Sequence, residues 1–144
     1  MVNRNKRGFT LIEILVAISI VAVLSAVSLS ALGGTRKVSR DGKRKADMEQ
    51  VRSALEIYRS DCSAYPTALP TPGGSLTASC PNLGTYLSAM PDDPIPGTYK
   101  YSYNRTGVNT YNLCAHLEIG GASELSGCAA GSCTGVCNYK QGNP

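Results

Sequence analysis

The sequence has no tryptophan, one phenylalanine and one histidine, so its eight tyrosines supply most of the aromatic side chains available to a core. The histidine, His116, lies in no recognisable motif with a serine or cysteine nucleophile. Carboxylate pairs suited to acid–base chemistry are also missing, because Asp92 and Asp93 stand between two prolines and are typical of a turn. We therefore expect no catalytic site and no enzymatic activity.

Charge is nearly absent from the N-terminal region. Between Phe9 and Leu32 the only charged side chain is Glu13. As a helix these residues would extend roughly 36 Å, enough to cross a hydrocarbon core of about 30 Å. A secretory signal peptide fits less well, because its apolar core is shorter and rarely carries a carboxylate. The pattern predicts a membrane-spanning helix that holds one costly charge.

The positive charge of the chain is concentrated at its beginning. Residues 1–45 contain nine basic and two acidic side chains, whereas residues 60–144 contain three basic and five acidic ones. Six of the nine lie in the stretch Arg36–Lys45, directly after the apolar run. By the positive-inside rule the C-terminal part would be cytoplasmic. The cysteines, all located after the apolar run, indicate the opposite, an oxidising compartment, and composition does not resolve this conflict.

The stretch "RGFTLIEILVAISIVAVL" resembles the processing signature of class III signal peptides, found in type IV pilins and in the pseudopilins of type II secretion systems. In that signature a short basic leader ends in glycine, here Gly8, followed by Phe9 and, four residues later, by Glu13. The resemblance implies that prepilin peptidase cuts between Gly8 and Phe9 on the cytoplasmic side and that the new terminus, Phe9, is N-methylated. It also implies that Glu13 pairs with the Phe9 amine of a neighbouring subunit, or with its own amine in an isolated subunit.

Two further stretches, "KRKADMEQVRSALEIYRSDCSAYPTAL" and "YLSAMPDDP", are similar to major, G-like pseudopilins. This likeness implies a structural subunit of a type II secretion pseudopilus, assembled through its N-terminal helix to drive protein export. The alternative is a type IV pilus subunit for adhesion, motility or DNA uptake. The implied partners are other copies in a homo-oligomeric filament, prepilin peptidase, an inner-membrane assembly platform and minor pseudopilins.

The expected fold class is α+β, pilin-like: a long N-terminal helix packed on a small antiparallel β-sheet. We expect a cleaved leader at 1–8, a transmembrane and assembly helix at 9–32, and a periplasmic or extracellular head domain at 33–144. Helical spacing of apolar residues continues the helix to about residue 60. Alternating patterns predict strands at 98–104 and 110–119, whereas 63–84 and 120–135, rich in small residues and proline, are expected to be loops.

The even number of cysteines predicts disulfides in the head domain. The candidates are Cys62, Cys80, Cys114, Cys128, Cys133 and Cys137. Cys62 and Cys80 flank one loop and form the preferred first pair. The other four allow three pairings, and if 136–140 is a strand beside 111–118, Cys114–Cys137 and Cys128–Cys133 would follow.

We expect no metal and no other cofactor. The cysteine spacing lacks the paired Cys-x2-Cys knuckles of structural zinc modules. Major pseudopilins often hold calcium in a C-terminal loop with aspartates, but this tail has no aspartate after Asp93, only Glu118 and Glu124. Calcium is therefore doubtful. For the basic stretch Arg36–Lys45 we favour contact with membrane lipids over nucleic acid, because it directly follows the apolar run.

Overall fold

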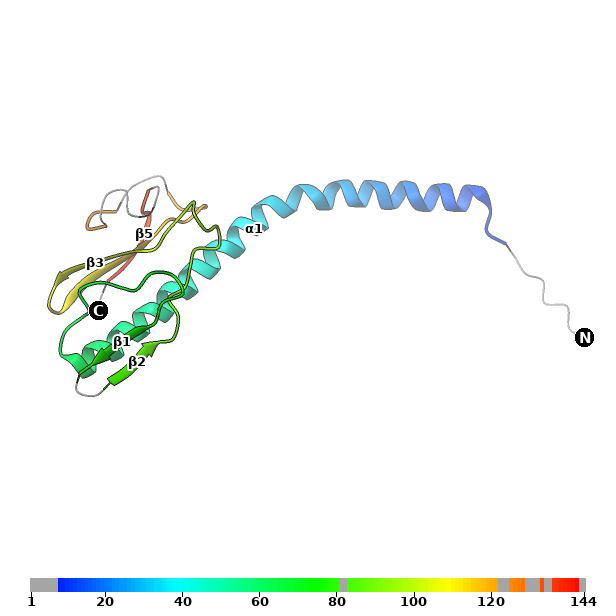
Figure 1. Ribbon diagram of the computed structural model, residues 1–144. Coiled ribbons are helices and arrows are strands. Elements are labelled where there is room, and N and C mark those ends of the chain that lie inside the picture. The colour runs from blue at the N-terminus through cyan, green and yellow to red at the C-terminus, as the bar shows by residue number, and fades with distance from the viewer. Residues whose placement is uncertain (1–7, 81–82, 122–124, 129–132, 134–135, 143–144) are drawn as a thin grey trace, which may run out of the picture. The chain divides into compact units, whose positions relative to one another are not determined.

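The computed structural model describes residues 8–80, 83–121, 125–128, 133 and 136–142. The chain divides into two units, Met1–Arg36 and Lys37–Pro144, and each is described by itself. A single helix, α1 (Leu11–Cys62), contributes its first part to one unit and its remainder to the other (Figure 1).

The first unit contains the apolar part of α1. The segment Leu11–Ser28 is long and apolar enough to cross a membrane, and none of its side chains is buried within the unit. Two hydroxyls in this segment are satisfied by the helix itself. Ser19 donates to the Val16 carbonyl at 2.8 Å, and Ser28 donates to the Leu24 carbonyl at 2.9 Å. Serine can therefore lie in this apolar helix without an unmet hydrogen bond.

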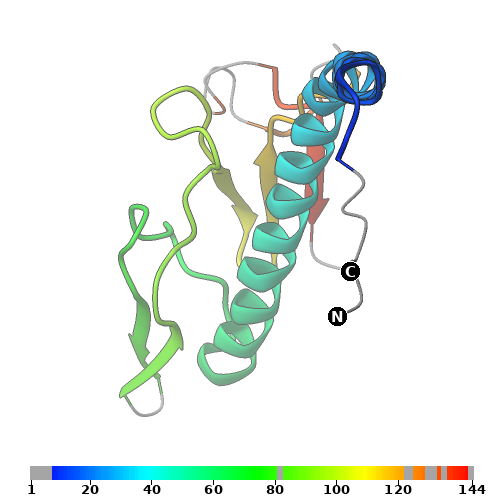
Figure 2. The same ribbon diagram turned by 90° about the vertical axis from the view of Figure 1, so that its right-hand side faces the viewer.

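The second unit, the head, places the rest of α1 across one face of a three-stranded sheet (Figure 2). The sheet has the antiparallel order β3 (Ser102–Gly107), β4 (Thr110–Ala115) and β5 (Tyr139–Gly142). In its register, Leu113 of the central strand lies opposite Tyr103 on one side and Gln141 on the other. Together with the apolar helix of the first unit, this gives the α+β, pilin-like fold expected from the sequence.

The strand predictions need four corrections. The first predicted strand, β3, begins at Ser102 and not at residue 98, so Tyr99 and Tyr101 precede it. The second, β4, ends at Ala115 and not at residue 119. The stretch 63–84, expected to be a loop, contains β1 (Leu76–Ser79) and the start of β2 (Leu83–Leu87), which form a separate antiparallel hairpin. The last correction concerns the predicted strand at 136–140, which is shifted to Tyr139–Gly142.

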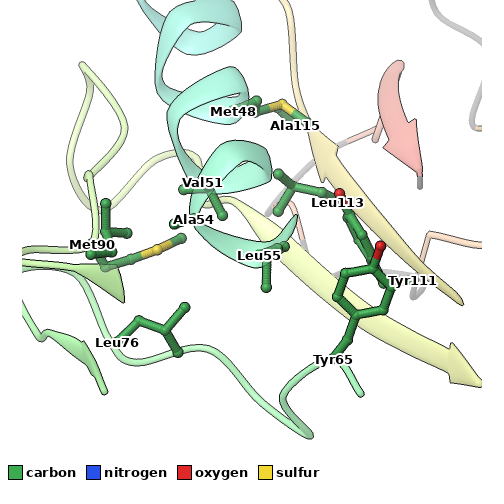
Figure 3. Close-up of a cluster of buried hydrophobic side chains, with 11 residues drawn as sticks. Met48, Val51, Ala54, Leu55, Tyr65, Leu76, Met90, Tyr111, Leu113 and Ala115 are labelled. Carbon is green, nitrogen blue, oxygen red and sulfur yellow. The ribbon is translucent and has the colours of Figure 1, made fainter. Parts of the chain in front are cut away.

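The core of the head is formed where α1 meets the strands, as Figure 3 shows. Met48, Val51 and Leu55 repeat at helical spacing and are at most 1% exposed. They pack against the strand residues Leu113 and Tyr111, which are buried to the same extent. This apolar cluster fixes the second half of α1 on the sheet, and so defines which face of the helix remains outside.

Candidate assembly site at the start of the helix

The residues of the predicted processing site lie directly before α1. Gly8 and Phe9 precede the helix, and Phe9 is 83% exposed. A Cβ added at Gly8 would meet no atom within 4 Å, so the backbone here is open to close approach by another protein. Thr10 is the last residue before the helix and acts as its N-cap.

Glu13 forms a capping box with Thr10. The Thr10 backbone N–H and hydroxyl both donate to Glu13 Oε2, at 2.8 and 2.7 Å, and the Glu13 N–H donates to Thr10 Oγ1 at 3.3 Å. This reciprocal pattern satisfies two N–H groups that the first turn of a helix leaves without partners. Sequence reasoning identified Glu13 but not Thr10, although the spacing Thr-x-x-Glu before an apolar run is a recognised sign of such a box.

Two arginines of the basic stretch after the apolar run are part of the structure of the head. Arg44 is fully buried. Arg40 is half-buried and donates two hydrogen bonds to the Glu118 carboxylate, both at 2.6 Å. Arg44 donates two bonds to Asp93, at 2.7 and 2.9 Å, and one each to Asp41 and Glu118, at 2.7 and 3.0 Å. These two arginines therefore stabilise the head and are not available to lipid headgroups, which corrects the expectation that the whole stretch contacts the membrane.

Asp41 completes this network by accepting bonds from the backbone N–H groups of Glu118 and Ile119, both at 2.9 Å. Hydrogen bonds from Arg40 lower the pKa of Glu118 from its ordinary 4.5 to about 2. The bonds to Asp93 raise the pKa of Arg44 further above its usual value. The network thus keeps Arg44 and Glu118 charged at physiological pH, and it ties α1 to two segments that are distant in sequence.

The cysteines are paired as Cys62–Cys80, Cys114–Cys128 and Cys133–Cys137. The first bond is the pair that the sequence favoured. The tail pairing proposed from a strand at 136–140 is wrong: Cys114 bonds to Cys128, because Gly127 lies over β4, where its carbonyl accepts a bond from Asn112. Cys114, Cys133 and Cys137 are buried against one another with Cys128 beside them.

The remaining candidate site residues, His116 and Asp93, make contacts that hold the fold together. His116 stacks on Tyr99 with ring centroids 4.3 Å apart, and its Nδ1 lies 2.7 Å from the Val136 carbonyl oxygen. Asp93 binds Arg44 and also accepts the Ile95 N–H, as expected of a turn residue. Within the described part of the chain, no group of three or more His, Cys, Asp or Glu side chains is placed to hold a metal ion.

The fold and the helix start define a class of protein: a membrane-anchored subunit with a pilin-like head. Comparison with known families agrees with this class. A family model for the prokaryotic N-terminal methylation motif matches residues 3–29, and one for protein G of the type II secretion system matches residues 32–125. The chain belongs to the type II secretion system protein G family.

Relatives in this family match most of the chain. The type II secretion system core protein G of Vibrio cholerae is 30% identical over 126 residues, which cover 82% of this chain and 86% of the relative. The core protein G of Pseudomonas aeruginosa is 30% identical over 131 residues, which cover 85% of this chain and 92% of the relative. The core protein G of Klebsiella pneumoniae is 31% identical over 106 residues, which cover 67% of this chain and 74% of the relative. No solved structure gives a significant match.

These relatives support the first of the two functions that the sequence suggested. The chain is a structural subunit of a type II secretion pseudopilus. The alternative, a type IV pilus subunit, shares the processing signature but not the match of residues 32–125 to the secretion family.

Proposed function

We propose that the chain is made as a precursor and matured at its N-terminus before it assembles. Prepilin peptidase cuts between Gly8 and Phe9 on the cytoplasmic side, and the new amine on Phe9 is methylated. The match of residues 3–29 to the methylation motif and the open backbone at Gly8 support this. The mature chain then consists of a transmembrane and assembly helix, 9–32, and a head domain, 33–144, that faces the periplasm or the cell exterior.

The observation that carries the proposed assembly mechanism is the position of Glu13. Its carboxylate lies in a segment long enough to cross a membrane, and within the described residues it accepts hydrogen bonds from Thr10, at the start of the same helix. An ionised carboxylate in hydrocarbon is stabilised strongly by a nearby cation. The amine created on Phe9 of a neighbouring copy is such a cation. Subunit addition therefore neutralises a buried charge, and this sets the axial position of each new subunit.

The other proposed partners are those of an export filament: further copies of this chain, minor pseudopilins, the inner-membrane assembly platform and prepilin peptidase. We infer a single-pass inner-membrane location before incorporation. The exposed residues of the basic stretch, which include Lys37 and Lys43, are the ones that contact lipid headgroups. Nucleic-acid binding has less support, since Arg40 and Arg44 are engaged by carboxylates. The role is structural and not enzymatic, and it requires no cofactor; calcium remains doubtful.

Mass analysis of the N-terminus of the membrane-bound protein tests the maturation step. The expected result is a chain that begins at N-methylated Phe9. A chain that begins near Gly34, or an uncut chain that retains Met1, would contradict the proposal. A Gly8→Val variant should accumulate as precursor, whereas Gly34→Val, the same change at a glycine within α1 and distant from the cut, should be cut normally.

Assembly is tested separately with Glu13→Ala. This variant should be cut and inserted normally but should form at least tenfold fewer filaments, counted by electron microscopy of cells that overexpress the chain. Glu49→Ala is the matched control, because Glu49 lies on the same helix but in the head, where its side chain is 56% exposed. Normal filament numbers in Glu13→Ala cells would show that the carboxylate does not guide assembly.

A further inference from the structure

One part of the head is free of charge. From Ser63 to Pro91 the sequence runs through 29 residues without a single charged side chain, although 17% of the whole chain is charged. We call this segment the uncharged lobe. It contains β1 and β2 and lies beside the end of α1, apart from the sheet β3–β4–β5 (Figure 2).

The uncharged lobe is firmly attached to the helix. The Cys62–Cys80 disulfide joins the last residue of α1 to the segment between the two strands. Tyr86 of β2 donates to Asp61 Oδ2 at 3.0 Å, and its ring lies 5.1 Å from that of Tyr58. Leu76 and Leu87 are buried in the common core. The lobe is therefore held in a fixed position by covalent, polar and apolar contacts together.

The outer surface of the lobe has the properties of a contact surface. In the described residues the β1–β2 sheet has only two strands, so each has an edge without a partner strand. Sheet edges are usually protected by charged side chains, which are absent here. The exposed face carries Thr77, Thr85 and Leu83, and at 81% Leu83 is the most exposed large apolar side chain of the described head.

A groove of about 500 Å³ opens next to the lobe. One wall is formed by the proline-rich segment 67–72 of the lobe and the other by Tyr101 and Tyr103. Met90 and Leu113 contribute apolar surface, and its charged residues are Asp92 and Lys100. The head thus carries a protruding apolar side chain and a partly apolar groove at different positions on one molecule.

We propose that Leu83 of one copy docks into this groove on the next copy in the filament. This inference rests on the proposed assembly function. An open filament is built by repeating one heterologous contact, in which two different patches of the same protein meet. A protruding side chain and a groove satisfy that requirement, and the lack of charge on the lobe means that contact there removes few charged groups from water.

Photo-cross-linking in the full chain tests this contact. A benzophenone amino acid in place of Leu83 should give cross-links between copies in filaments, and peptide mapping should place them at the groove, near Thr67, Pro72 or Gly97. The same residue in place of Val108, an exposed side chain of the β3–β4 turn, should not cross-link to the groove. Cross-links from position 83 to another part of a second copy, to a different protein, or to nothing would each overturn the inference.

A charge substitution gives an independent measurement. Leu83→Asp should form at least fivefold fewer filaments than the unchanged chain, whereas Val108→Asp should stay within twofold. Both variants should be cut normally and keep the unfolding midpoint of the unchanged chain. Equal filament numbers for the two variants would overturn the inference. Failure of the assembly mechanism is seen separately, as normal filaments in Glu13→Ala, so the two hypotheses can fail independently.

Discussion

The two halves of α1 each carry one conspicuous charge, and the partners of the two charges differ. Glu13 has partners only within its own first turn among the described residues, in a unit where no side chain of the apolar segment is buried. Arg44 is fully buried and is bonded to three carboxylates of its own chain. A charge satisfied inside the chain stabilises the fold. A charge left for a neighbour makes assembly favourable instead.

The largest effect on stability is expected for Arg44→Met. Removing the guanidinium leaves Asp41, Asp93 and Glu118 together without their shared cation, and breaking a buried ion pair in this way costs about 3–5 kcal/mol. The free energy of unfolding of the full chain in detergent, followed by circular dichroism in denaturant, measures the loss.

The matched control for Arg44 is Arg52→Met, on the same helix. Its side chain is 34% exposed, and its guanidinium lies 3.7 Å from a Glu49 oxygen, so the change should cost less than about 1 kcal/mol. If the two variants unfold at the same denaturant concentration, the network around Arg44 contributes little, and the contrast with Glu13 would not hold.

The next largest effect concerns the disulfides, which are found only in the head. Replacing Cys114 and Cys128 by alanine opens a loop of 14 residues and should cost about 3 kcal/mol on the entropic model. Replacing Cys133 and Cys137 opens a loop of 4 residues and should cost about 2 kcal/mol. Denaturant unfolding of both double variants would reveal the order, and a larger loss for the shorter loop would contradict the entropic account.

A smaller effect is expected from acid. Because the pKa of Glu118 falls from 4.5 to about 2 on folding, its contribution is complete above pH 4.5 and is lost as the pH falls toward 2. The contribution is no more than about 3 kcal/mol. The difference in unfolding free energy between the unchanged chain and Glu118→Gln should therefore shrink between pH 6 and pH 2.5. A constant difference would show that Arg40 does not hold this carboxylate ionised.

What could be predicted from the sequence was local in the chain. The helix, its apolar start and the position of Glu13 follow from neighbouring residues and from a recognised signature. The partners of Arg44 could not be predicted in this way, because Asp93 and Glu118 are 49 and 74 residues away. Nothing in the pattern of Arg36–Lys45 distinguishes an arginine that is buried by the head from a lysine that remains in solvent.

The hairpin β1–β2 was missed for a related reason. Its residues are small, uncharged and interspersed with proline and glycine, a composition typical of loops. The strands are held by burial of Leu76 and Leu87 in a core formed mainly by α1 and by the Cys62–Cys80 bond. Tertiary contacts therefore override local preference there. The tail disulfides were mispaired because the strand at 136–140 was placed too early by about three residues.

The smallest effect is expected for Thr10→Ala, and it tests how Glu13 is held before a neighbour arrives. Loss of the Thr10 hydroxyl removes one bond to Glu13 and the N-cap of the helix, a change worth about 1 kcal/mol, or about fivefold in an equilibrium. Filament numbers should therefore fall less than in Glu13→Ala, and Thr10→Ser should restore them. Ser19→Ala is the matched control, since the Ser19 hydroxyl donates to a carbonyl inside the helix and caps nothing. Equal filament numbers in Thr10→Ala and Ser19→Ala would show that the capping box does not prepare the carboxylate, and that the neighbouring amine alone positions Glu13.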